Sequence, residues 1–136
     1  MAMAMCRQGR VLLGVHHESP PTDEEWARWI ALALDPSADG VRTIVESSGN
    51  SGPNAKQRRA LADALGGADI RSAILTDSLV VRGIVTAIAW LNVSLRAFAP
   101  DQQREAAEYL GLDASERAWA FAELHRLRAE SGARAA

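Results

Sequence analysis

The sequence is poor in cysteine and contains no long hydrophobic run. Cys6 is the one cysteine among 136 residues, so the chain cannot form an internal disulfide, which is typical of a reducing compartment. No segment approaches the roughly 20 apolar residues of a membrane-spanning helix. The first residues also lack the charged and long apolar regions of a signal peptide. We therefore expect a cytoplasmic protein with no membrane span.

A large excess of one charge is also missing. The chain has 15 lysine and arginine residues against 17 aspartate and glutamate residues, which makes a net charge of −2. The one short basic run, residues 56–59, lies on a predicted helix. A protein with this balance has no overall field that attracts nucleic acid. We expect no nucleic-acid partner.

The motifs of common catalytic and cofactor sites are absent as well. Gly49 and Gly52 lack the G-x-G-x-x-G spacing of dinucleotide sites, and no Gly-Lys-Ser/Thr follows to make a Walker loop. The chain has no Gly-x-Ser-x-Gly elbow. Cys6 has no partner cysteine, and adjacent His16 and His17 would point to opposite faces of a strand. We predict no cofactor, no metal and no complete catalytic motif.

Apolar segments of two kinds alternate along the chain. The length and the 48% hydrophobic content fit one domain of ordinary size. Short apolar runs are followed by segments of helical periodicity, which indicates βαβ units and a parallel sheet. We predict an α/β domain over residues 1–130, with a four- to five-stranded, mainly parallel sheet, helices on both faces, an extra C-terminal helix and a frayed tail at 131–136. The expected strands are 3–6 (an edge strand), 11–16, 41–46, 70–76 and 95–98.

The expected helices begin at residues that cap helices well. Thr22 followed three residues later by Glu25 is a capping box. Pro53 suits the first position of a helix, because its missing N–H would be unpaired there in any case. The expected helices begin after Thr22, at Pro53, after Asp77 or Ser78, at Pro100, and after Asp113, where residues 113–116 form the cap of a last helix that continues to about residue 130.

Polar side chains are expected at the carboxyl ends of the strands, where parallel sheets bind ligands. His16, Glu46, Asp77 and Ser78 fall at these positions. With Ser48 in place of Ser78, the same region offers a hydrolase-like combination of serine, histidine and aspartate. The alternative is that Asp77 and Ser78 serve only as helix caps, since strand-to-helix loops need such residues.

The segment after the strand at 41–46 is rich in serine and glycine. Ser47, Ser48, Gly49, Ser51 and Gly52 precede a predicted helix, whose free N–H groups attract anions. One interpretation is an anion-binding or phosphoacceptor loop. The other is a flexible turn.

The third expected helix, residues 79–91, is apolar almost all round. Such a helix should be covered on more than one side. The cover comes either from the fifth helix or from a second subunit or protein partner. In the latter case the interface would use Val81, Ile84, Val85, Ile88 and Trp90.

The order of elements resembles that of the STAS superfamily, the sulphate-transporter and anti-sigma-antagonist domains. The resemblance rests also on the sequence Glu-Ser-Ser-Gly at 46–49, between a strand and a helix. A late strand with Arg96, Ala97 and Phe98 is followed by an acidic, alanine-rich helix that ends in Tyr109 and Leu110. Over about residues 9–112 the chain looks most like the bacterial STAS/CRAL-TRIO-like proteins.

The resemblance implies a non-enzymatic regulatory or protein-interaction domain that forms a homodimer or binds a protein partner. It also implies that Ser48 occupies the position that a partner kinase phosphorylates in anti-sigma antagonists, where the phosphate would lie at a positive helix N-terminus. Glu46 replaces the aspartate of that motif, and Asn50 replaces an apolar residue. The CRAL-TRIO similarity implies an alternative, a domain that binds a small apolar ligand or a lipid. A third alternative is a small hydrolase-like enzyme that uses His16, Glu46 and Asp77.

Overall fold

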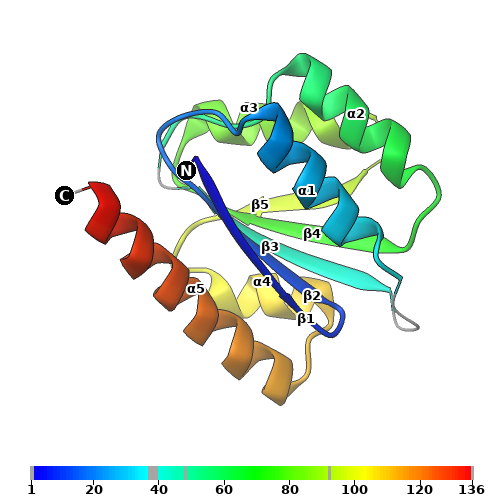
Figure 1. Ribbon diagram of the computed structural model, residues 1–136. Helices are drawn as coiled ribbons and strands as arrows, with labels where there is room; N and C mark the ends of the chain where they lie inside the picture. Colours follow the sequence, from blue (N-terminus) through cyan, green and yellow to red (C-terminus); the bar gives the residue numbers. More distant parts are fainter. Residues whose placement is uncertain (1, 37–39, 48, 92, 136) are drawn as a thin grey trace.

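The computed structural model describes residues 2–36, 40–47, 49–91 and 93–135, with side chains to residue 129. These residues form five strands and five helices (Figure 1). The strands are β1 (Met3–Gln8), β2 (Val11–His16), β3 (Val41–Ser47), β4 (Ile70–Leu75) and β5 (Ser94–Phe98). The helices are α1 (Asp23–Leu34), α2 (Ala55–Leu65), α3 (Leu79–Ala89), α4 (Gln103–Leu110) and α5 (Ala114–Ala135).

The five strands form one sheet in the order β1-β2-β3-β4-β5. β1 and β2 pair antiparallel through a tight turn at Gly9, whose φ of 58° suits glycine. β2, β3, β4 and β5 pair parallel, each with the next. The sheet is therefore mixed and mostly parallel, and the edge strand expected at 3–6 is confirmed as β1.

Reciprocal capping boxes start α1 and α5, as the sequence predicts. The Oγ1 of Thr22 accepts the N–H of Glu25 at 3.1 Å, and the Glu25 carboxylate accepts the N–H of Thr22 at 2.9 Å. Asp113 and Glu116 exchange the same two bonds at 2.8 and 2.9 Å. α5 then runs to Ala135, beyond the end that we expected near residue 130.

The N-terminal caps of α2 and α3 differ in how well the sequence predicted them. Asn54, not Pro53, marks the start of α2, and its side chain forms a capping box with Gln57. Pro53 therefore precedes the cap and is not the first helical residue. Ser78, not Asp77, caps α3, because the Ser78 hydroxyl accepts the N–H of Val81 at 3.2 Å.

The buried apolar side chains form two clusters that use alternate residues of the strands. Val45 belongs to the first cluster and its neighbour Ile44 to the second, since successive residues of a strand point to opposite faces. The first cluster contains residues of α1, α2 and α3, and the second contains residues of α4 and α5. In Figure 1 the first three helices lie together, with α4 and α5 across the strands from them.

α3 and α5 belong to different clusters, so the expectation that α5 packs across α3 is wrong. Trp119 and Phe121 of α5 pack on the second cluster, whereas α3 packs on the first. The reason lies in the connections. Right-handed crossovers between neighbouring parallel strands bring successive helices to one side of a sheet, and α1, α2 and α3 make these three crossovers. α4 and α5 follow the last strand and make none.

Candidate functional site

The expected polar edge is divided between the two faces of the sheet. His16 is paired in register with Ser47, whereas Glu46 is paired with Val15. His16 and Ser47 therefore face the first cluster, and Glu46 faces α5, where Arg128 donates to its carboxylate at 3.0 Å. Because adjacent strand residues alternate, Glu46 and His16 point to opposite faces, and the structure does not bring their side chains together.

The strand-to-helix loops at this edge are joined by a hydrogen bond between side chains. The Ser78 hydroxyl donates to Oδ1 of Asn50 at 2.7 Å, which ties the loop before α3 to the loop before α2. Ser78 is buried and Asp77 is exposed. His16 Nδ1 has no hydrogen-bond partner among the described residues, so no carboxylate there orients its ring as in a catalytic triad. Ser48 lies outside the described residues.

The serine-rich loop between β3 and α2 is held by its own polar side chains. The Ser47 hydroxyl donates to the Gly49 carbonyl at 3.3 Å, and the Ser51 hydroxyl donates to the Glu18 carbonyl. Ser47 is buried, whereas Ser51 is partly exposed. The capping box of Asn54 already uses one N–H at the start of α2. An anion at this helix would therefore meet fewer free donors than the sequence suggested.

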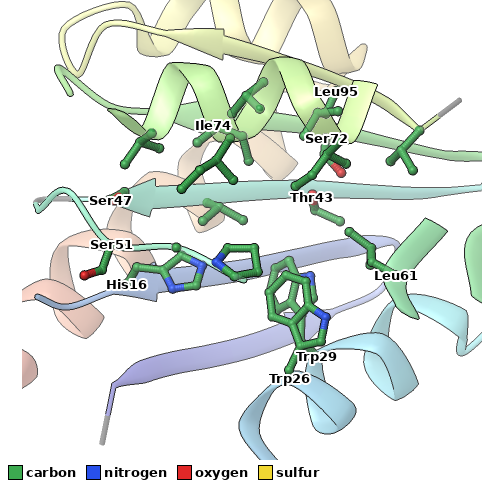
Figure 2. A pocket seen from close by; sticks show the side chains of 18 residues that line it. His16, Trp26, Trp29, Thr43, Ser47, Ser51, Leu61, Ser72, Ile74 and Leu95 are labelled. Carbon is green, nitrogen blue, oxygen red and sulfur yellow. The ribbon is translucent and has the colours of Figure 1, made fainter. Parts of the chain in front are cut away.

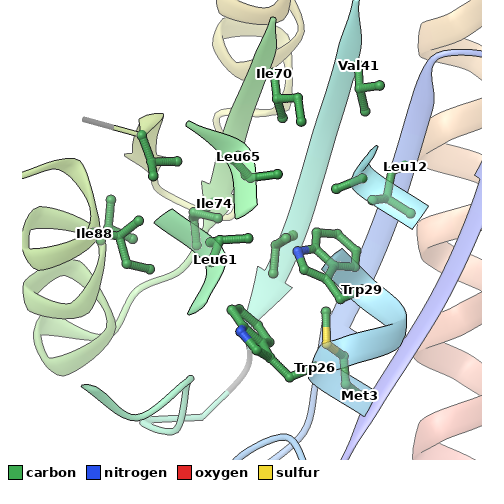
Figure 3. Close-up of a cluster of buried hydrophobic side chains, with 14 of the residues drawn as sticks. Met3, Leu12, Trp26, Trp29, Val41, Leu61, Leu65, Ile70, Ile74 and Ile88 are labelled. Carbon is green, nitrogen blue, oxygen red and sulfur yellow. The ribbon is translucent and has the colours of Figure 1, made fainter. Parts of the chain in front are cut away.

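A cavity of about 60 Å³ lies between the sheet and the helices α1, α2 and α3. Figure 2 shows its lining, and Figure 3 shows the surrounding first cluster, to which Trp26, Trp29 and Leu61 contribute. The Trp26 indole N–H is satisfied, since it donates to the Gln57 carbonyl at 2.8 Å. The polar side chains that line the cavity from the strands are His16, Thr43, Ser47 and Ser72.

Two buried polar atoms on this side of the sheet have no hydrogen-bond partner among the described residues. They are Nδ1 of His16 and Oγ1 of Thr43, in side chains that are 5% and 2% exposed. Burial, and to a lesser extent the nearby His17, lower the pKa of His16 to about 4, although Glu25 partly opposes the shift. His16 is therefore neutral at physiological pH, and the cavity contains two unsatisfied neutral hydrogen-bonding groups.

Sequence reasoning missed Thr43 and Ser72, although a signal was present. Both are hydroxyl residues within strands that are otherwise rich in apolar residues. Parallel strands covered on both faces are typically continuous apolar runs, so a hydroxyl inside one needs an explanation. Ligands of parallel sheets usually bind at strand ends, whereas Thr43 and Ser72 lie inside their strands.

Most of the expected interface residues of α3 are core residues. Val81, Val85 and Ile88 are buried against the sheet, and Ile84 is partly exposed and lines the cavity. That part of the prediction is therefore wrong for α3 in this chain. Trp90 is exposed, as an interface residue would be in the isolated chain.

Exposed apolar residues lie at the two ends of α3, and we refer to them together as the α3 surface. Leu79 and Val80 in the first turn are 85% and 56% exposed. Trp90, the residue that follows the helix, is 80% exposed. The first turn directly follows Ser78, which is bonded to the loop before α2, so the apolar residues and the serine-rich loop are neighbours.

Metal binding and membrane insertion are two further possibilities for the described part of the chain. No group of three or more histidine, cysteine, aspartate or glutamate residues there could hold a metal ion. None of its helices has the combined length and apolarity that crossing a membrane requires. Comparisons with protein-family models, with curated proteins and with solved structures found no match to this chain.

Proposed function

We propose that this chain is a non-enzymatic protein-interaction domain of STAS-like type, with helices on both faces of its mostly parallel sheet. The observation that carries the proposal is the α3 surface, Leu79, Val80 and Trp90. The element order and the serine-rich loop before α2, which resemble those of STAS domains, add support.

Exposure of these three side chains favours an interaction role on energetic grounds. Removing a leucine side chain of this kind from water stabilises a complex by roughly 1.5–3 kcal/mol. Aromatic residues, tryptophan above all, are enriched among the residues that dominate interface energies. With a rise of 1.5 Å per residue, Leu79 and Trp90 lie about 16 Å apart along the helix axis. A partner that packs on α3 would contact both ends of this surface.

The serine-rich loop is the proposed switch for this interaction. Among its serines, Ser47 is buried and Ser51 is partly exposed, and Ser48 is the position that the STAS resemblance favours for phosphorylation. A phosphate adds about −1.5 to −2 charge at neutral pH. Asn50 of this loop is bonded to Ser78, the residue before Leu79, so a negative charge on the loop would oppose the docking of an apolar partner surface on the first turn of α3.

A photoreactive amino acid tests the proposed surface by position. The crosslinker replaces Leu79 in one variant and the exposed Ala122 of α5 in a matched control, and each is irradiated in the native host. We expect a protein adduct at position 79 that is lost when Ser48→Asp is added, and no such adduct at position 122. Equal adducts at both positions, or none at position 79, would contradict the proposal. Light scattering of the purified chain shows whether the partner is a second copy.

Small-ligand binding is a second candidate function, favoured by the cavity beside the first cluster. Its two unsatisfied polar atoms need a partner, and neither the sheet nor the described helices provide one. A cavity of about 60 Å³ has room for a few water molecules and not for the acyl chain of a lipid. A small ligand therefore suits this cavity better than the lipid that the CRAL-TRIO similarity suggests.

A further inference from the structure

Two hydroxyl side chains lie next to each other at one end of the cavity. Thr43 of β3 and Ser72 of β4 are paired in register on neighbouring parallel strands, and both line the cavity. Neighbouring strands lie about 4.8 Å apart, so one small polar group can reach both hydroxyls. In Figure 2 Thr43 and Ser72 are seen together, away from His16. His16 is paired with Ser47, four residues further along β3, or roughly 13 Å from Thr43 along the strand.

The region around this pair of hydroxyls is apolar. Leu61 of α2 and Val85 and Ile88 of α3 line the same cavity from the helices. A buried water molecule typically needs two to four polar partners. A cluster of waters that filled the cavity would therefore lack partners along these helices. A molecule with one polar end and a short apolar part matches the cavity better.

The lining also determines the charge of the molecule that it accepts. Among the described residues, the cavity is lined by no aspartate, glutamate, lysine or arginine, and His16 is the one titratable group that lines it. The buried imidazole is neutral at physiological pH because its pKa is lowered to about 4. A charged ligand would lose its hydration here without gaining an opposite charge, and this loss is costly. The ligand must therefore be uncharged.

We propose that the cavity is a binding site for a small uncharged molecule with a hydroxyl group, which Thr43 and Ser72 hold between them. The ligand hydroxyl donates a hydrogen bond to one of these side chains and accepts one from the other. Its apolar part lies against the helices and extends toward His16. This binding satisfies the Thr43 hydroxyl, which has no partner among the described residues of the chain itself. The site is separate from the α3 surface and does not rest on the proposed protein interaction.

The tryptophans of the chain allow the site to be tested with internal controls. Trp26 and Trp29 line the cavity, whereas Trp90 is exposed and Trp119 packs on the second cluster. The indole N–H signals of all four appear in one ¹⁵N-correlated NMR spectrum. 1-Propanol and 1-butanol are the probes, and sodium butyrate is the charged analogue. We expect saturable shifts of Trp26 and Trp29 with the alcohols, and neither saturable shifts of Trp90 and Trp119 nor binding of butyrate.

Isosteric variants then assign the hydrogen bonds. Thr43→Val and Ser72→Ala each remove one hydroxyl from the cavity, and Thr86→Val makes the same change as the first on the exposed side of α3. We expect about tenfold weaker alcohol binding for Thr43→Val and Ser72→Ala, and unchanged binding for Thr86→Val. Three results would overturn the proposal: no saturable shift at any indole, as for a cavity that holds water only; parallel linear shifts of all four indoles; or equal affinity in Thr43→Val and Thr86→Val.

Discussion

The two clusters beside the sheet differ in how well their buried polar groups are satisfied. On the side of the second cluster, the largely buried Arg42 donates to the Leu110 carbonyl at 3.2 Å and to the Val41 carbonyl at 3.0 Å. On the side of the first cluster, His16 Nδ1 and Thr43 Oγ1 have no partner among the described residues. Burying such groups without a hydrogen bond lowers the stability of the folded state. The unsatisfied groups beside the first cluster therefore carry a cost that the bonded Arg42 beside the second cluster does not.

The second cluster is also better packed than the first. In the second cluster, small alanines of α4 and α5 are fully buried and allow the helices to approach the strands closely. The first cluster borders a cavity, and its helix α3 exposes apolar side chains at both ends. Functional regions often contain such departures from good packing, because binding sites need space and unsatisfied groups. The second cluster is therefore the better packed of the two, and both proposed binding sites lie beside the first.

The largest expected effect is a difference between two leucine-to-alanine variants. Leu124 is fully buried in the second cluster, and Leu61 is buried in the first but borders the cavity. We expect Leu124→Ala to lower the free energy of unfolding by about 4 kcal/mol and Leu61→Ala by about 2.5 kcal/mol. The reason is that Leu61 has fewer packing partners to lose. Urea denaturation measures both values, and equal losses would remove the difference in packing on which the comparison depends.

Acid should destabilise the protein through His16, on the first side. Its pKa is about 4 in the folded chain and near 6.5 when unfolded. Between these pH values the unfolded chain binds a proton that the folded chain does not, so the stability present above pH 6.5 is lost as the pH falls toward 4. Between pH 7 and 4, we expect the wild type to lose roughly 3 kcal/mol more than His16→Gln does.

The control for this pH experiment is His125→Gln, because His125 is exposed on α5. This variant should lose stability with acid as the wild type does. Urea midpoints at several pH values provide the measurement. If His16→Gln and the wild type lost the same stability between pH 7 and 4, His16 would not be buried in its neutral form beside the first cluster.

A smaller effect is expected from the ion pair that attaches α5 to the sheet on the second side. Arg10 Nε and Nη2 donate to the two carboxylate oxygens of Glu116 at 2.7 and 2.9 Å. These hydrogen bonds are the main reason why the pKa of Glu116 is lowered, so its contribution is present at neutral pH and lost in acid. We expect Glu116→Gln to reduce stability by about 1 kcal/mol at pH 7.

Glu105→Gln is the matched control for the ion pair, since Glu105 is an exposed acidic residue in the first turn of α4. It should change stability by less than about 0.5 kcal/mol. Thermal unfolding at pH 7 compares the two variants. If Glu105→Gln reduced stability as much as Glu116→Gln, the effect would come from the loss of a negative charge in general and not from the ion pair with Arg10.

The smallest effect on stability is expected at the α3 surface. Leu79→Ser and Val80→Ser change exposed side chains, so the free energy of unfolding should change by no more than about 0.5 kcal/mol. Binding of a protein partner, in contrast, should be strongly reduced. Denaturation together with the crosslinking assay separates the two effects. A large loss of stability would mean that these residues support the fold and are not a free docking surface.

Much of the fold could be predicted because its signals are local. The capping boxes at Thr22 and at Asp113 depend on residues three positions apart, and each starts its helix as predicted. The alternation of short apolar runs with helical segments likewise indicates a mostly parallel sheet. The start of the second helix was predicted two residues too early, at Pro53, because Asn54 has the side chain that caps α2 and Ala55 is its first residue.

The candidate site was harder to predict because it depends on register and on the side of the sheet. Glu46 and Ser47 are neighbours in sequence, yet successive strand residues point to opposite faces, so Glu46 faces α5 and Ser47 faces the first cluster. Thr43 and Ser72 lie far apart in sequence, and the pairing of β3 with β4 brings them together.

By itself, the sequence determined the type and order of the elements and most of the helix starts, since these depend on interactions within a few residues. The tertiary structure alone decided which buried cluster each helix joins, which hydroxyls line the cavity together, and which apolar residues of α3 remain exposed. The physical reason is that strand pairing and crossover direction act between segments distant in the chain, and no local pattern records them.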